Sequence, residues 1–128
     1  MGADLRYMIE TKRSGGWIAA VVTPLCIDRD YSLFGLLNGI RSDREPLFPI
    51  RGFPRDMDTY GLTGEHGDLF DDNVAASWLS LSEATLVAQT YREENGKPSI
   101  QWEAAVAFMS VYEAAGIQTR VCFGCDQG

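Results

Sequence analysis

Apolar and polar residues alternate along the first part of the chain in the pattern of β-strands. Between residues 5 and 13 the apolar residues Leu5, Tyr7 and Ile9 alternate with charged ones, so we expect a half-buried strand. The charged residues are Arg6, Glu10 and Lys12. The turn residues 14–16 (SGG) then lead into the apolar run 17–25, which predicts a returning strand and hence a β-hairpin. Pro24 cannot donate to a ladder, so it should lie at the end of the strand or on an edge.

Helical spacing replaces this alternation further along the chain. Asp30 fits the N-cap of a first helix, whose apolar positions are Leu33, Phe34, Leu36, Leu37 and Ile40. Ser80 and Glu83 fit a capping box. They predict a second helix from about residue 81 to residue 94, stopping at Asn95-Gly96.

A third helix is predicted to open at Pro98-Ser99 and to end near Gly116. Its apolar stripe is Trp102, Val106, Met109 and Tyr112. The apolar run 117–125 predicts a final strand. Residues 42–77 hold three of the five prolines together with many glycines and acids, so we expect a long irregular segment there.

The element order β-β-α-loop-α-α-β predicts an α+β fold within a single domain, residues 1–128. We expect a small, mainly antiparallel sheet made of the N-terminal hairpin and the C-terminal strand. About three helices should pack on this sheet, and the long irregular central loop should join the first helix to the second. The last strand should pair with one strand of the hairpin.

Composition narrows the range of partners. The net charge of −7 argues against nucleic-acid binding and against docking on an anionic membrane, because both need a basic surface. The chain has no apolar run of transmembrane length and no apolar core of a signal peptide, so we expect a cytoplasmic protein. The three cysteines are an odd number, which points to thiols rather than a disulfide framework.

Residues 50–56 (IRGFPRD) form the most distinctive stretch of this acidic chain. Arg51 and Arg55 with backbone N–H groups near Gly52 could hold a phosphate or carboxylate. Nearby aromatic side chains could stack on a base. The full predicted ligand-binding set is Arg51, Gly52, Arg55, Tyr31, Trp78, Arg41 and His66. The alternative is a rigid connector whose arginines pair with acids such as Asp56. Trp78 could equally be a core residue.

Two further groups of residues suggest metal or catalytic chemistry. Cys122 and Cys125 form a C-x-x-C motif, which Cys26 and His66 could complete as a zinc site. Residues three apart on a strand point to opposite faces, so chelation would need a turn at Gly124. We therefore expect no metal, no cofactor and no disulfide. His66, among acids, could be a general base or a solvated loop residue.

Five short blocks spread over nearly the whole chain carry a resemblance to a known family. They are residues 4–10 (DLRYMIE), 28–34 (DRDYSLF) with Arg41 after them, 49–54 (PIRGFP), 77–81 (SWLSL) and 120–126 (RVCFGCD). With these blocks the chain resembles a family of small, functionally unassigned proteins of tailed bacteriophages and prophages. Ile50 and Cys125 depart from the family pattern. The resemblance implies a phage origin and carries no assigned catalytic residues.

These observations lead to one functional hypothesis and two rivals. We expect a phage accessory protein that works in the cytoplasm of the infected bacterial host. It would counter an antiviral defence by sequestering a small nucleotide-derived signal, as a homo-oligomer by analogy with other sequestering proteins. One rival is an acidic nucleic-acid mimic that inhibits a host defence protein through Asp68, Asp71 and Asp72. The other is a nucleotide-cleaving enzyme that uses His66 and nearby acids.

Overall fold

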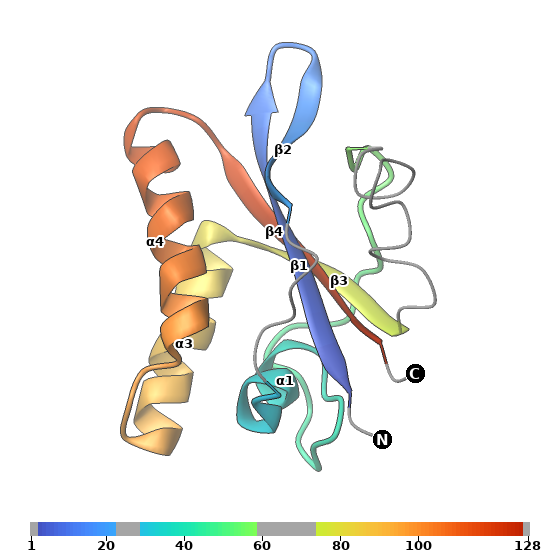
Figure 1. Ribbon diagram of the computed structural model, residues 1–128, viewed down its shortest axis with the longest axis vertical. Coiled ribbons are helices and arrows are strands. Elements are labelled where there is room, and N and C mark those ends of the chain that lie inside the picture. Colours follow the sequence, from blue (N-terminus) through green and yellow to red (C-terminus); the bar gives the residue numbers. More distant parts are fainter. Residues whose placement is uncertain (1–2, 23–28, 59–73, 127–128) are drawn as a thin grey trace.

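The computed structural model describes residues 3–22, 29–58 and 74–126 of the chain (Figure 1). Its elements follow the order β1 (Asp4–Arg13), β2 (Gly16–Val22), α1 (Tyr31–Leu37), β3 (Val74–Ser80), α3 (Leu81–Asn95), α4 (Ile100–Ala114) and β4 (Thr119–Asp126). The four strands form one antiparallel sheet in the order β2-β1-β4-β3. The predicted α+β class, the N-terminal hairpin and the pairing of the last strand with that hairpin are confirmed. Each described helix is too short or too polar to cross a lipid bilayer.

One strand is missing from the sequence-based prediction. Residues 74–80 were assigned mostly to the irregular segment, but they form β3 and pair with β4. Alanines and serines make up most of this strand, and neither has the strand preference of β-branched or aromatic residues. A register shift between Val74 and Ser77, with a left-handed φ of 54° at Ala75, further interrupts the alternation. Residues 59–73 of the predicted loop, and 23–25 of the predicted second strand, lie outside the described residues.

The main core lies between the sheet and the three helices. Leu5 and Ile9 of β1 and Val121 and Phe123 of β4 point to this side. They meet the fully buried Trp102 of α4, whose ring lies edge-on to Phe123 at 6.5 Å and whose indole N–H donates to the Ala84 carbonyl at 3.0 Å. In Figure 1, α3 and α4 lie side by side against this face and α1 lies at one end of it.

Most of the predicted helix signals are confirmed, but α1 ends at Leu37, so the predicted helical position Ile40 lies beyond it, after Gly39 with φ 76°. Asp30 caps α1 by accepting from the Leu33 amide, and Ser80 and Glu83 form the full capping box of α3. Gly96 ends α3 in a left-handed conformation with φ 72°. Gly35, inside α1, leaves room for Ser42, because a Cβ at this position would lie 2.6 Å from the Ser42 hydroxyl oxygen. The packing that this helix needs is therefore supplied by the chain that follows it.

Candidate functional site

The predicted arginine loop covers the face of the sheet opposite the helices. Residues 51–58, called here the 51–58 loop, place Met57 against Met8 and Cys122 in a second small core. Phe53 and Trp78 pack against the same cluster. The Gly52 amide donates to the Ala76 carbonyl at 2.8 Å, and φ at Gly52 is 76°. The loop is therefore a packed layer of the fold.

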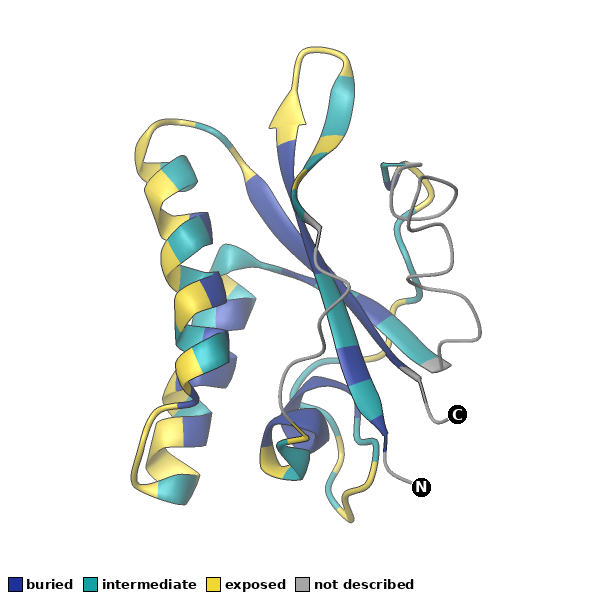
Figure 2. Cartoon of the chain, in the orientation of Figure 1, coloured by how far each residue is buried: buried dark blue, intermediate teal, exposed yellow. Residues whose placement is uncertain are grey.

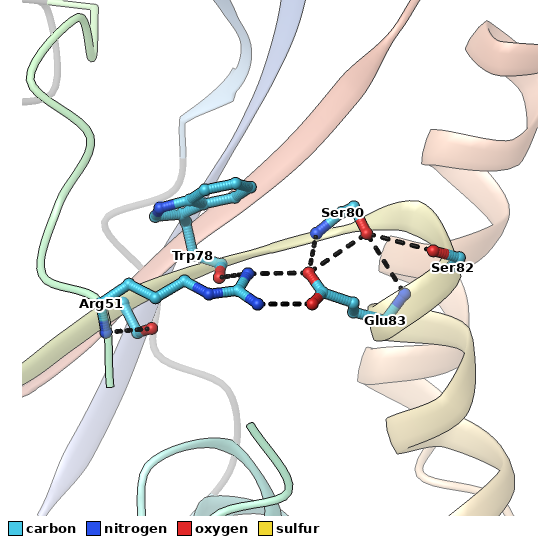
Figure 3. Close-up of polar contacts among 6 residues, drawn as sticks. Arg51, Trp78, Ser80, Ser82 and Glu83 are labelled. Carbon is cyan, nitrogen blue, oxygen red and sulfur yellow. Dashed lines mark hydrogen bonds and ion pairs between the residues drawn. The ribbon is translucent and has the colours of Figure 1, made fainter. Parts of the chain in front are cut away.

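Arg51 fastens one end of this loop to helix α3. Its guanidinium donates from both terminal nitrogens to the Glu83 carboxylate, with Nη1–Oε1 at 2.7 Å, and from Nη1 to the Trp78 carbonyl at 3.0 Å (Figure 3). The same group lies over the Trp78 ring at 4.7 Å. The hydrogen bonds from Arg51 are the main cause that lowers the pKa of Glu83 from 4.5 to about 2. Because the Arg51 charge is balanced inside the chain, an anion would have to displace Glu83 to use it.

The backbone amides of Arg51 and Gly52 are also occupied. The Arg51 amide donates to the Ser77 hydroxyl at 3.0 Å, next to the Gly52 bond to Ala76. Both acceptors belong to β3, the strand that the sequence-based prediction lacked. These two amides therefore hold the loop on the sheet instead of presenting donors to a ligand.

A buried ion pair lies beneath the other end of the loop. Glu10 is fully buried and accepts from Arg120 Nε at 2.7 Å. Arg120 stacks over Trp17 at 4.0 Å and binds Asp56 through Nη1 at 3.0 Å. The second Glu10 oxygen accepts from the Asp58 amide at 2.6 Å. Burial of two charges is tolerated because nearly every donor and acceptor of the pair is satisfied.

The predicted site residues do not form one pocket within the described chain. Trp78 belongs to the loop-covered face, whereas Tyr31 packs on Phe34 at 5.4 Å on the helix-covered face and accepts from the Ala3 amide. Arg41 follows α1 with a left-handed φ of 56° and is exposed. Arg55 is exposed and has no ion-pair partner among the described residues. His66, like Asp68, Asp71 and Asp72, lies outside the described residues.

The two C-terminal cysteines point to opposite faces of β4. Cys122 lies in the loop-covered core and Cys125 in the helix-covered core, and both are free thiols. Burial and the nearby Glu10 carboxylate raise the pKa of Cys122 well above its ordinary value. The two sulfur atoms therefore cannot coordinate the same metal ion. A thiol held in its neutral form is also unsuited to nucleophilic attack.

Another concave site, absent from the sequence-based prediction, opens at the start of α4. This α4 N-terminal pocket has a volume of about 310 Å³, within the range of small-molecule sites. Its lining residues come from the start of α1, from α3 and from the α3–α4 connection: Asp30, Tyr91, Lys97, Pro98, Ser99, Ile100 and Gln101.

Ser99 is the unusual residue of this pocket. It is the N-cap residue of α4 and only 8% exposed, yet its hydroxyl makes no capping bond. The hydroxyl is not among the buried side-chain polar atoms left without a partner in the described chain, so it keeps some contact with solvent. A hydroxyl in a pocket lining that makes no capping bond is available to contact a ligand there. Lys97 lies two residues before Ser99. Its side chain is exposed and adds a positive charge to the pocket lining.

The pocket lining also contains an acidic residue, Asp30. The Tyr91 hydroxyl donates to the Asp30 carboxylate at 2.5 Å. Burial and this hydrogen bond raise the pKa of Tyr91 to about 12, so the phenol stays protonated at neutral pH. The pocket lining thus combines a cation, Lys97, and the N-terminal end of α4 with the hydrogen-bond acceptors Asp30 and Tyr91.

A sequence signal for this pocket exists. Ser80 has a glutamate three residues later and closes a capping box, whereas Ser99 has Trp102 at the matching position. Ser99 therefore lacks the glutamate that would close a capping box, although Glu103 follows in the first turn of α4. Comparisons with protein-family models, curated protein sequences and solved structures find no match to this chain.

Proposed function

We propose that this protein binds and sequesters a small anionic, nucleotide-like molecule in the α4 N-terminal pocket. The observation that carries the proposal is the pocket itself, in which Ser99, the N-cap residue of α4, makes no side-chain capping bond and lies in the lining beside Lys97. A helix N-terminus with a lysine and a free hydroxyl offers what a phosphate group needs.

The rest of the pocket favours a nucleotide over a simple anion. Asp30 and the Tyr91 oxygen can accept from sugar hydroxyls or an exocyclic amine, while Pro98 and Ile100 supply apolar surface. A ligand that carries both a negative group and hydrogen-bond donors matches these lining residues. The site therefore differs from the predicted arginine loop, whose Arg51 is already paired with Glu83.

Binding without chemical conversion fits the groups present. The described lining residues include no histidine or cysteine, and the Tyr91 phenol is kept protonated by its pKa of about 12. Ser99 has no base within hydrogen-bond reach in the described chain, so its hydroxyl is suited to contact a ligand rather than to attack one. The setting of the proposal, a phage protein that captures a bacterial defence signal, rests on the family resemblance alone.

Ligand retention tests this function. Equilibrium dialysis would measure binding of AMP, ADP-ribose and cyclic di-AMP, with adenosine as the control that lacks phosphate. We expect at least one nucleotide to bind, adenosine to bind much more weakly, and heat denaturation to release the nucleotide intact. Recovery of an altered nucleotide would show an enzyme instead. No retention of any of the three at millimolar concentration would overturn the proposal.

Matched lysine variants locate the site. The chain has two lysines, Lys12 and Lys97, and Lys12 lies over the Trp17 ring at the far end of β1. Lys97→Ala should weaken binding by about tenfold to a hundredfold, because a charge-assisted hydrogen bond is worth about 1.5–3 kcal/mol. Lys12→Ala removes the same charge elsewhere and should leave binding unchanged. Equal effects of the two variants would contradict the assignment of the site.

A further inference from the structure

Helix α4 is apolar on the side that faces away from the core as well as on the side that faces it. Ile100 and Val111 are 73% and 70% exposed. The α4 outer stripe is defined by these two residues and by the exposed alanines between and after them: Ile100, Ala104, Ala107, Val111, Ala114 and Ala115. Figure 2 shows exposed positions along the outward side of α4 over its whole length. A helix that is apolar on both sides normally has a partner on both sides.

The stripe is also free of unbalanced polar groups. Ser110, the exposed polar residue among these positions, donates its hydroxyl to the Val106 carbonyl of its own helix at 2.9 Å. The flanking acids are engaged within the chain, since Glu103 pairs with Arg92 at 3.1 Å and Glu113 accepts from Thr119 at 2.8 Å. A partner for this face therefore needs to bring apolar surface rather than charge.

From these observations we infer that the α4 outer stripe docks a second copy of this chain. Two copies that each carry a net charge of −7 repel one another. Two copies can approach most easily through a face without charges, and the α4 outer stripe has no charged residue. A foreign partner attracted by the acidic surface would instead bring basic groups, for which the stripe offers no acceptor.

The residue sizes along the stripe fit a two-fold antiparallel helix pair. With the symmetry axis near Ala107, Ala104 faces Val111 of the partner subunit and Ile100 faces Ala115 of the partner subunit. Small residues opposite branched ones let two helices approach closely and interlock. A 15-residue helix is about 22 Å long, and such a pair buries on the order of 1,000 Å² in total, the lower limit for a specific interface.

Sedimentation velocity tests the pairing directly. We expect the unmodified chain to dimerise at micromolar to tens of micromolar concentration and Ala107→Glu to be monomeric, because it places two carboxylates at the symmetry axis. Ser32→Glu adds the same charge at an exposed position of α1 and should still dimerise. A chain that stays monomeric at several hundred micromolar, or an Ala107→Glu variant that still dimerises, would overturn the inference and leave this face for another protein.

Cysteine cross-linking tests the orientation and does not depend on a disruptive variant. In a Cys26→Ser background, Ala107→Cys should form an intermolecular disulfide rapidly under mild oxidation. Ala115→Cys should not, because an antiparallel pair holds these two positions about 24 Å apart. Equal cross-linking at both positions would contradict the antiparallel arrangement.

Discussion

The Glu83 carboxylate joins helix α3 to the 51–58 loop by accepting from Arg51 while it closes the capping box of that helix. Its Oε1 atom receives the Ser80 amide at 3.0 Å and Arg51 Nη1 at 2.7 Å (Figure 3). A residue that looks in the sequence like a simple helix start therefore also anchors the loop that covers the second face of the sheet.

Loss of this carboxylate should weaken the fold in a pH-dependent way. The folded pKa of about 2 lies below the ordinary 4.5, so the stabilisation is complete above pH 4.5 and is lost as the pH falls toward 2. The difference corresponds to an upper value of about 3 kcal/mol. Urea unfolding should show Glu83→Gln less stable than the unmodified chain at pH 7, with most of the gap closed at pH 2.5.

The exposed pair of Arg44 with Glu94 provides the control for this experiment. Glu94 is 46% exposed, and surface pairs of this kind contribute between 0 and about 1 kcal/mol. Glu94→Gln should therefore change the free energy of unfolding little at either pH. A Glu83→Gln penalty that stays the same at pH 7 and pH 2.5 would show that ionisation of this carboxylate is not its source.

The two serine N-caps should respond differently to the same substitution. Ser80→Ala removes a real capping bond and should lower the free energy of unfolding by about 1 kcal/mol. Ser99→Ala removes a hydroxyl that caps nothing, so stability should change by less than about half of that, while nucleotide binding falls. Thermal unfolding and dialysis on both variants check this. Equal destabilisation by the two would mean that Ser99 is an ordinary cap.

The buried pair of Glu10 with Arg120 should be sensitive to the loss of one partner. Arg120→Met leaves the Glu10 carboxylate buried without its counter-charge, which typically costs about 3–5 kcal/mol. Glu10→Gln combined with Arg120→Met should recover part of this loss, because no unpaired charge remains. Arg92→Met, at a half-exposed pair, is the control for removing an arginine. An Arg120→Met cost no larger than that of the control would contradict this account.

Local signals in the sequence were strong enough to place most of the fold. The caps at Asp30, Ser80 and Gly96 depend on neighbours within four residues, so single residues identify them. Strand β3 depends instead on its pairing with β4, about 40 residues later, and its small residues carry little preference of their own. Sequence reasoning could not place such an element.

The candidate site also combines features that local sequence signals indicate with features that depend on residues far apart in the chain. The sequence correctly marked Arg51 as exceptional, but the partner that balances it, Glu83, lies 32 residues away and comes close only through β3. The alternative that Arg51 pairs with an acid is the one that the contacts support. The α4 N-terminal pocket was missed because its walls come from α1, α3 and α4, and only folding brings Asp30 beside Lys97 and Ser99.

Backbone amide chemical shifts give the most direct test of where a ligand binds. The assigned spectrum of the ¹⁵N-labelled protein would be recorded during titration with AMP and, separately, with inorganic phosphate. The account predicts saturable shifts at Ser99, Gln101 and Trp102, the first turn of α4, with the residues of the 51–58 loop unmoved. Shifts centred on Arg51, Gly52 and Arg55, or no saturable shift at the start of α4, would contradict it.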